Sequence, residues 1–399
     1  MKAYRLKAGK PYELTLTDNA LEPVPESDEV LIRIRAAGLN YLDLMVANAR
    51  FGNVDASFVP GADGAGEIVE VGSRVKGWKA GDRVIAGMIV DWAAGPLTVA
   101  NGERLRGVTM PGSLAEYAVV PATALVAIPA AMPFVQAASL PVAATTAWNA
   151  IVAGNVRPGS TVALLGTGGV SLFALPLAKA AGARVIIASS SDEKLARARK
   201  LGADVIINYR TTPAWDVALL EATEGRGADL VVETVGVATF ERSVNAAAIG
   251  GTIFVVGLIG GEETKMPLLK VMVKTLRIVG NQTGSTANLA NAVKALAQSR
   301  IEPVIDRVFR KRYFMAAWTD LKPLYKVIPV TSSGGDYFGR KECETIEPQG
   351  PTELRTGVPT ASCRCGERAG YFGSEARAGA RAESQYGVQV APATAGGPV

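Results

Sequence analysis

The residues best suited to carry chemistry form a glycine-rich turn between an apolar strand and a helix. The turn reads Gly-Thr-Gly-Gly-Val-Ser over residues 166–171, with strands predicted at 162–165 and 184–188. Glycine lets the backbone approach a pyrophosphate, and a helix N-terminus offers free N–H groups and a positive dipole end. The complete βαβ unit favours a dinucleotide site over a turn in another parallel sheet. The predicted contacts are Gly166, Thr167, Gly168, Gly169 and Val170.

The end of the second strand indicates which dinucleotide is bound. NAD-binding units usually carry Asp or Glu there, to bind the ribose hydroxyls. This strand ends in Ser189-Ser190-Ser191, and Asp192 follows only inside the next helix start. Small hydroxyls leave room for a 2′-phosphate and can donate to it, and Lys194 can add positive charge. We therefore predict NADPH in preference to NAD, with these serines and Lys194 as contacts; the alternative is a serine turn that caps the helix.

Missing residue types limit the chemistry further. The chain has 399 residues and no His, and its three Cys, at 343, 363 and 365, all lie near the C-terminus. No Ser–His–Asp or Cys–His machinery, His general base or imidazole zinc site can therefore form. Three late Cys make no disulfide framework and favour a cytoplasmic location.

Two kinds of element must position these residues. Up to about residue 120 the sequence shows short alternating segments punctuated by glycine, which predicts a compact, mainly β module. From about residue 161, apolar strands alternate with helices, which predicts a parallel sheet covered on both faces. We expect β-module strands at 30–35, 67–71 and 82–85; sheet strands at 162–165, 184–188, 205–207, 229–233 and 252–256; and helices at 172–181, 192–201, 214–223 and 240–247.

The last part of the chain changes character. A helix is predicted at 287–299, a strand at 303–309, a helix near 314–325 and a final strand near 338–346. Residues 350–399 contain no Lys and show no periodicity, so we predict a disordered tail there.

One long apolar stretch and the net charge exclude two further classes of protein. Residues 117–156 contain no charged side chain, but four prolines and several polar residues interrupt them, so we predict a buried domain junction and no membrane span. The net charge of +5 is spread along the chain, and the one basic cluster, at 310–312, is expected to be solvated. Nucleic acid is therefore not a predicted partner.

Three motifs together resemble the medium-chain dehydrogenase/reductase superfamily. They lie at 166–174, 64–69 (Gly-Ala-Gly-Glu-Ile-Val) and 81–84 (Gly-Asp-Arg-Val). Within the superfamily, residues 1–346 look like the zinc-free alcohol dehydrogenase-like and quinone oxidoreductase-like branches. The resemblance implies an α/β fold, a doubly wound Rossmann sheet inserted in a GroES-like β-barrel catalytic domain. The expected boundaries are 1–124 and 284–349 for the catalytic domain, 125–283 for the Rossmann domain and 350–399 for the tail.

The same resemblance implies that zinc is absent. The superfamily's zinc enzymes hold catalytic metal with Cys, His and a second Cys or an acid, and the matching positions here are Asn40, Ala62 and about Val142. The lobe for structural zinc would fall within 88–113, which has no Cys. Because zinc prefers thiolate and imidazole, we predict no metal site.

Without zinc or His, hydrogen-bond donors must polarise a substrate carbonyl. The first candidates are in the predicted loop Asn40-Tyr41-Leu42-Asp43, which resembles the family's segment beside the nicotinamide. Asn40 would orient cofactor or substrate and Tyr41 could donate, while a plain loop held by Asx hydrogen bonds is the alternative. Asp63 could be catalytic or structural, and Thr146 could lie beside the nicotinamide or cap a helix. The candidate catalytic set is therefore Asn40, Tyr41, Asp43, Asp63 and Thr146.

Other cofactor contacts are expected at the carboxyl edge of the sheet, where ligands bind. Val256 and Gly257 should meet the nicotinamide carboxamide through their backbone, and Asn281 follows the last strand. The edge strand 276–280 could pair with its copy in a homodimer.

The predicted function is a zinc-independent, NADPH-dependent oxidoreductase that transfers hydride to a small-molecule quinone, enone or carbonyl. Reduction is favoured because removing an alcohol proton normally needs a base or metal. The alternatives are alcohol oxidation within the same class, or a non-catalytic NADPH-binding protein with a sensing or RNA-binding role.

Overall fold

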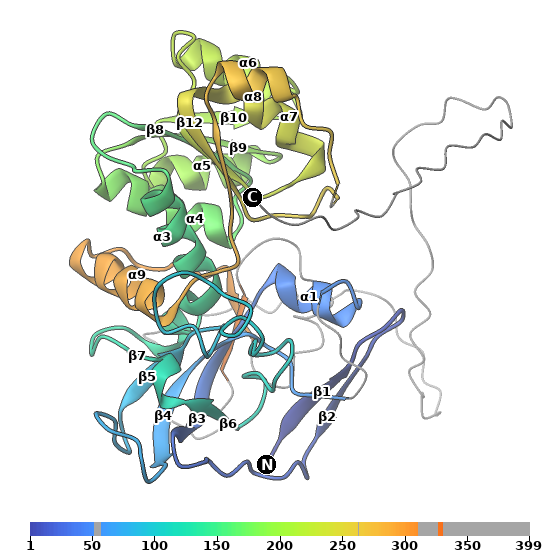
Figure 1. Cartoon of the computed structure of the whole chain (residues 1–399), viewed down its shortest axis with the longest axis vertical. Coiled ribbons are helices and arrows are strands. Elements are labelled where there is room, and N and C mark those ends of the chain that lie inside the picture. The colour runs from blue at the N-terminus through green and yellow to red at the C-terminus, as the bar shows by residue number, and fades with distance from the viewer. Residues whose placement is uncertain (52–56, 262, 310–325, 330–399) are drawn as a thin grey trace, which may run out of the picture. The chain divides into compact units, whose positions relative to one another are not determined.

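The computed structural model describes residues 1–51, 57–261, 263–309 and 326–329 (Figure 1). Several predicted features lie outside the described residues: the basic cluster 310–312, the helix near 314–325, the strand near 338–346, the tail 350–399 and all three Cys. The description below concerns the unit Met1–Gly335.

The central element of the second half is a parallel sheet in the order β10-β9-β8-β11-β12-β13. The chain runs outward from β8 in one direction and then returns to begin again at β11, so the switch point lies between these two strands. This order is that of a dinucleotide-binding Rossmann sheet. The strands are β8 (Thr161–Leu165), β9 (Arg184–Ser189), β10 (Val205–Asn208), β11 (Ala228–Glu233), β12 (Ala247–Val255) and β13 (Arg277–Gly280).

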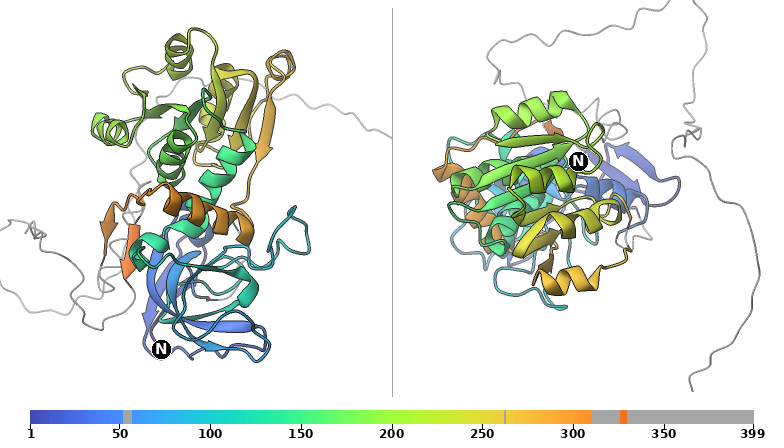
Figure 2. Two further views of the ribbon diagram at one scale, coloured as in Figure 1. Left: turned by 90° about the vertical axis from the view of Figure 1, so that its left-hand side faces the viewer. Right: turned by 90° about the horizontal axis from the view of Figure 1, so that it is seen from above.

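Helices cover both faces of this sheet (Figure 2), as the continuous apolar strands predict. Alternate residues of β8 serve the two faces: Val162 and Leu164 belong to one buried cluster, Ala163 and Leu165 to the other. The helix after β8 begins at Gly169, three residues earlier than predicted. The helices are α4 (Gly169–Ala180), α5 (Asp192–Lys200), α6 (Trp215–Ala222), α7 (Val237–Ala246) and α8 (Leu268–Val273).

The first half forms a β domain that includes strands from both ends of the described chain. Its main sheet runs β14-β15-β3-β4-β5-β7, with β6 also paired to β3, and β1 and β2 form a separate pair. β15 pairs antiparallel with β3, so a segment late in the described chain adds a strand to this sheet. The strands are β1 (Ala3–Lys7), β2 (Glu13–Thr17), β3 (Glu29–Leu39), β4 (Asp63–Val71), β5 (Arg83–Ala86), β6 (Tyr117–Pro121), β7 (Leu125–Ala127), β14 (Arg307–Val308) and β15 (Lys326–Pro329).

Two local predictions for this domain need correction. The predicted boundary at residue 124 is too early, because β7 pairs with β5 of the β-domain sheet. The strand predicted at 303–309 is only two residues long, since just Arg307 and Val308 find a partner strand there.

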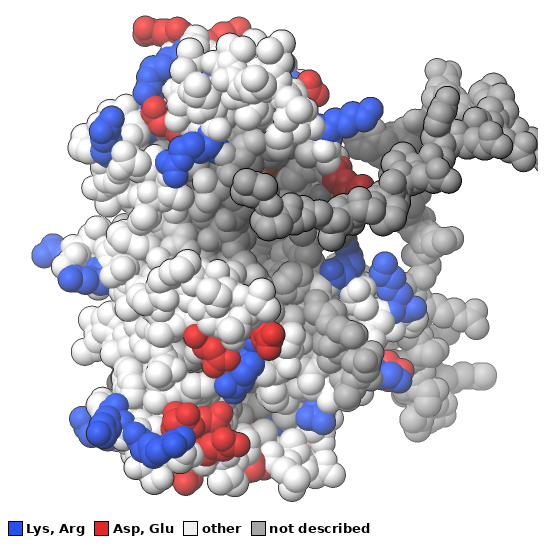
Figure 3. Space-filling view, viewed as in Figure 1, with Lys and Arg blue, Asp and Glu red and all other residues white. Residues whose placement is uncertain are grey.

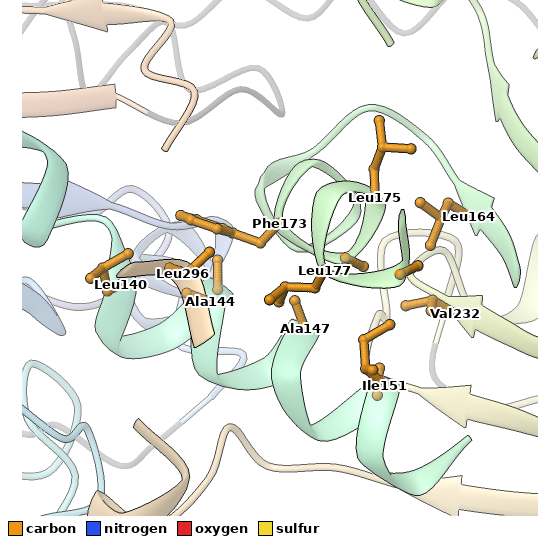
Figure 4. Packing of buried hydrophobic residues seen from close by; sticks show 14 of the residues in the cluster. Leu140, Ala144, Ala147, Ile151, Leu164, Phe173, Leu175, Leu177, Val232 and Leu296 are labelled. Atoms are coloured by element: carbon orange, nitrogen blue, oxygen red, sulfur yellow. The ribbon is translucent and has the colours of Figure 1, made fainter. Parts of the chain in front are cut away.

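The uncharged stretch 117–156 forms the predicted buried junction. It includes α2 (Phe134–Ala137), the π-turn η2 (Leu140–Ala144) and α3 (Thr145–Ala153), after the single turn η1 (Ala122–Ala124). Leu140, Ala144 and Ala147 are fully buried and pack with side chains of α4 and α9 (Thr286–Gln298) (Figure 4). No helix among the described residues is long and apolar enough to cross a membrane.

Glu233, which the sequence did not single out, organises the carboxyl end of β11. The side chain is completely buried, and its Oε1 accepts from the N–H groups of Val235 (2.9 Å) and Gly236 (3.0 Å) and from Thr239 Oγ1 (2.7 Å). Its Oε2 accepts from Ser243 Oγ. These donors belong to the turn before α7 and to α7 itself, so one carboxylate fixes the loop beside the switch point.

Glu233→Ala should lower the free energy of unfolding by about 3 kcal/mol, because it leaves several buried donors without an acceptor. Urea unfolding followed by circular dichroism measures this loss. Glu241→Ala, on the exposed side of α7, is the matched control and should change stability by less than about 0.5 kcal/mol. Equal effects of the two substitutions would contradict this role for Glu233.

Candidate functional site

The predicted loop at residues 40–43 is instead the start of a helix. β3 ends at Leu39, Asn40 is the N-cap of α1 (Tyr41–Ala47), and the Asn40 N–H donates to Asp43 Oδ2 at 2.7 Å. This reciprocal arrangement, with an acidic residue three positions after the N-cap, is a capping box. The Asn-x-x-Asp spacing therefore first serves to begin α1, and it turns both side chains inward, where they are buried.

Asp63 connects this helix start to the domain junction. The carboxylate is fully buried at the beginning of β4. Its Oδ2 accepts from Asn40 Nδ2 at 2.9 Å, and its Oδ1 accepts from the Val142 N–H at 3.0 Å. The structure thus brings together Asn40, Asp63 and Val142, from three segments far apart in sequence.

Asp43 lies beside Asp63 in the same buried cluster. Burial, reinforced by the negative charge of Asp63, raises the pKa of Asp43 to about 7, and hydrogen bonds from the N–H groups of Asn40 and Ala62 oppose that rise. A carboxyl group with such a pKa exchanges its proton near neutral pH, which an ordinary Asp does not do.

The two hydroxyl candidates differ in their surroundings. Thr146 is buried on α3, and its Oγ1 donates to the Val142 carbonyl at 2.7 Å, so it bonds within its own helical segment and is not an N-cap. Tyr41 is partly exposed at the first position of α1. A chain of hydrogen bonds therefore links Thr146 through Val142 and Asp63 to Asn40, while the role of Tyr41 remains a prediction.

Arg106 is a further charged residue beside this cluster, and no local sequence pattern singles it out. Its side chain is 1% exposed, and it donates from Nη2 to Ser113 Oγ at 2.7 Å and from Nη1 to the Ala86 carbonyl at 3.5 Å. Burial lowers the pKa of Arg106 to about 10, and the attraction of Asp63 opposes this shift. Arg106 lies in the segment 88–113, which contains no Cys.

These residues do not fit zinc. Ala62 and Val142 have no ligating side chain, Asn40 directs its amide nitrogen at Asp63, and both Asp63 oxygens accept from N–H groups. Across the described ranges, no group of three or more His, Cys, Asp or Glu side chains could hold a metal ion. Zinc sites normally use thiolate or imidazole ligands, which this cluster lacks.

The glycine-rich turn has the geometry that a dinucleotide requires. Gly166 has φ +72°, a conformation that favours glycine, and a Cβ there would meet nothing within 4 Å, so space is open in front of the turn. Gly168 is the N-cap of α4 and provides no side-chain cap. The first N–H groups of α4 are therefore left for a ligand, as pyrophosphate binding needs. Ser171 donates to the Leu165 carbonyl at 3.0 Å and packs the helix on the strand.

The serine segment divides into three roles. Ser189 is buried, and its Oγ lies 3.2 Å from Thr167 Oγ1, so it joins β9 to the glycine-rich turn. Ser191 is the N-cap of α5 and accepts from the Lys194 N–H at 3.4 Å, as the capping alternative predicts. Ser190 and Lys194 are partly exposed, and their contact with a 2′-phosphate stays a prediction.

The other cofactor candidates lie at the carboxyl edge of the sheet. The N–H groups of Val256 and Gly257, just after β12, both donate to the Glu233 carbonyl (3.0 and 3.2 Å), so only their carbonyls remain for a carboxamide. Asn281 follows β13 and accepts from Asn149 Nδ2 of α3 at 3.4 Å. Its own Nδ2 is buried without a hydrogen-bond partner in the structure described, which makes it an available donor.

A Rossmann sheet with an open glycine turn, joined to a β domain that draws strands from both parts of the chain, defines a nucleotide-dependent dehydrogenase. Two family profiles agree: residues 26–130 match the alcohol dehydrogenase GroES-like domain, and residues 169–298 match the zinc-binding dehydrogenase family.

Known proteins resemble the chain over most of its length. A zinc-type alcohol dehydrogenase-like protein of Schizosaccharomyces pombe is 40% identical over 289 residues, 70% of this chain and 84% of the relative. The acryloyl-coenzyme A reductase of Metallosphaera sedula is 29% identical over 336 residues, 82% and 98% of the two chains. The crystal structure of a candidate alcohol dehydrogenase from Sinorhizobium meliloti superposes with a TM-score of 0.76 at 35% identity, covering 82% and 98%.

The chain belongs to the medium-chain dehydrogenase/reductase superfamily. It is an alcohol dehydrogenase-like, NAD(P)-dependent oxidoreductase.

The pKa of Asp43 predicts a specific pH dependence of stability. Because the folded-state pKa, about 7, lies above the ordinary value of 3.8, the folded protein holds this proton more tightly than the unfolded chain does. This contribution to stability is complete below about pH 4, decreases up to about pH 7 and is then gone. The melting temperature of the wild type should therefore fall by about 5 °C more between pH 5 and pH 8 than that of Asp43→Asn.

Differential scanning calorimetry at the two pH values measures this difference. Asp18→Asn removes an exposed carboxylate, 75% accessible, and should retain the pH dependence of the wild type. If the melting temperatures of Asp43→Asn and of the wild type fall by the same amount between pH 5 and pH 8, the pKa of Asp43 is not raised.

Proposed function

We propose that this protein reduces a small-molecule quinone, enone or carbonyl with NADPH and without zinc. One observation carries the proposal: the three positions that match zinc ligands hold Asn40, Ala62 and Val142. Asp63 accepts from N–H groups of Asn40 and Val142, and the Ala62 N–H donates to Asp43. When bound, NADPH supplies the hydride. The protein then has to orient the reactants and polarise an oxygen with donors.

The proposed roles follow the surroundings of each residue. Asn40, held by Asp63 and Asp43, would orient the nicotinamide or the substrate, and Tyr41 and Thr146 are the candidate hydroxyl donors. A carboxyl group that titrates near pH 7, as Asp43 does, favours a site that delivers a proton. The acryloyl-coenzyme A reductase is a relative whose name describes a reductase of an activated double bond, which supports the enone class.

Alcohol oxidation is the second candidate, because several relatives are named alcohol dehydrogenases. A non-catalytic NADPH-binding protein with a sensing or RNA-binding role is the third. Lys and Arg are interspersed with Asp and Glu on the face shown in Figure 3. Positive charge is therefore not concentrated on this face, as nucleic-acid binding would favour.

The organisation of the protein is part of the proposal. We place it in the cytoplasm as a homodimer, with β13 at the open edge of the Rossmann sheet as the pairing strand. Leu269, Met272 and Val273 of α8, the helix that leads into β13, are each about 70% exposed, which would be costly without a covering surface. The domain ranges proposed are 1–130 and 284–349 for the catalytic domain and 131–283 for the Rossmann domain.

The purified protein should oxidise NADPH with members of a quinone, enone and aldehyde panel at a rate unchanged by EDTA or 1,10-phenanthroline. Absorbance at the NADPH band measures turnover, and mass spectrometry of the dialysed protein should find far less than one zinc per chain. A zinc-dependent alcohol dehydrogenase under the same chelators is the control. If the protein binds NADPH but turns over no member of the panel, the reductase proposal is contradicted and the non-catalytic NADPH-binding role is favoured. Turnover only with an alcohol and NADP would favour alcohol oxidation.

NADPH specificity rests on Ser190 and Lys194. Lys194→Met should weaken NADPH about tenfold and leave NADH within about twofold, because only NADPH carries the 2′-phosphate. Titration of cofactor fluorescence measures both affinities. Arg197→Met on the same helix α5, where Arg197 pairs with Glu193, is the matched control, and tighter NADH than NADPH binding by the wild type would contradict the preference.

A further inference from the structure

The carbonyl of Leu165, the last residue of β8, accepts hydrogen bonds from two hydroxyl groups. Ser171 Oγ of α4 donates at 3.0 Å, and Thr234 Oγ1, from the loop after β11, donates at 2.6 Å. Ser171 belongs to the same βαβ unit, whereas Thr234 comes 69 positions later in the chain. Because Leu165 directly precedes Gly166, Thr234 holds the strand end from which the glycine-rich turn begins.

This hydrogen bond extends the pairing of β8 with β11 beyond the backbone ladder. The register between the two strands runs from Val162 opposite Leu230 to Leu164 opposite Val232. These strands are neighbours at the switch point of the sheet, and ligands of such sheets bind outside the carboxyl ends of the strands there. The Thr234 hydroxyl therefore fixes the spacing of the two loops across which a dinucleotide would lie.

The backbone of Thr234 is itself held by its neighbours. A Cβ on Gly257 would collide with the Thr234 carbonyl, so the loop after β12 packs directly on this residue and only glycine fits at the contact. The Glu233 carboxylate accepts from the two N–H groups that follow Thr234 in the chain. Thr234 therefore connects three loops at the carboxyl edge of the sheet, those that follow β8, β11 and β12.

We propose that Thr234 is a positioning residue for the dinucleotide. Through Leu165 it sets the glycine-rich turn, which suits the pyrophosphate, relative to the loops after β11 and β12, which the nicotinamide half would meet. A ligand that spans these loops binds best when their spacing is fixed before it arrives. The inference rests on the proposed place of the nicotinamide half, but it requires neither the preference for NADPH nor the reductase reaction.

Thr234→Val replaces the hydroxyl with a methyl group of similar size, and isothermal titration calorimetry measures the effect on binding. NADPH and NADH should both bind about tenfold more weakly, because the spacing affects the parts that the two cofactors share. Thr234→Ser keeps a hydroxyl and should stay within about threefold of the wild type. The fragment 2′,5′-ADP carries only the adenosine half, does not span the loops, and should lose less than about twofold.

Thr223→Val is the matched control, because Thr223 carries a buried hydroxyl at the opposite edge of the sheet. Its Oγ1 donates to the Leu219 carbonyl at 2.9 Å and accepts from the Gly227 N–H, just before β11 begins. The substitution should lower the melting temperature by about 3 °C or more, because it leaves a buried N–H without its acceptor. The affinities for both cofactors should nevertheless stay within about twofold of the wild type.

Unchanged cofactor affinity in Thr234→Val would overturn the proposal, and so would a loss matched by Thr234→Ser or by Thr223→Val. A loss for 2′,5′-ADP as large as that for NADPH would overturn it too, since spacing matters only to a ligand that spans the loops. If Thr234→Val does not fold, Thr234→Ala removes the same hydroxyl and carries the same expectations. A wild type that shows the expected binding pattern but no turnover would support the positioning role while refuting the reductase function.

Discussion

The hydrogen bonds of one buried carboxylate hold the candidate site together. Asp63 accepts from Asn40 at the start of α1 and from Val142 in the turn that leads into α3, so it joins the β domain to the junction helices. Burial, reinforced by the negative charge of Asp63, raises the pKa of the neighbouring Asp43 to about 7.

The cofactor side depends on a second carboxylate that acts in a similar way. The Glu233 carboxylate accepts from N–H groups of the turn before α7 and from a hydroxyl of α7. Its backbone carbonyl accepts from the N–H groups of Val256 and Gly257. A Cβ at Gly257 would collide with Thr234, so the loops that follow β11 and β12 meet closely. A buried acid therefore fixes the backbone in both halves of the candidate site.

Most of the Rossmann sheet and the glycine turn could be predicted from sequence, because apolar runs, helix periodicity and glycine act locally. The misjudged parts depended on distant partners. Residues 40–43 read as a loop, yet the capping box begins a helix once Asp43 is buried. The strand Leu125–Ala127 was assigned to the wrong domain because only its pairing with β5 shows where it belongs. Sequence alone left two roles for Ser191, a cofactor contact or a helix cap. The hydrogen bond that its side chain accepts from the Lys194 N–H makes it a cap.

The sequence by itself determined the class: the βαβ unit with its glycine-rich turn, the uncharged junction at 117–156, and a chain with no imidazole and no thiol before residue 343. Only the tertiary structure decided which buried charges influence one another. Arg106 and Asp63 are separated by more than forty residues, and nothing in local spacing connects them. The electrostatic balance of a buried site is a property of three-dimensional distance and of water exclusion, which arise only when the β domain has closed around it.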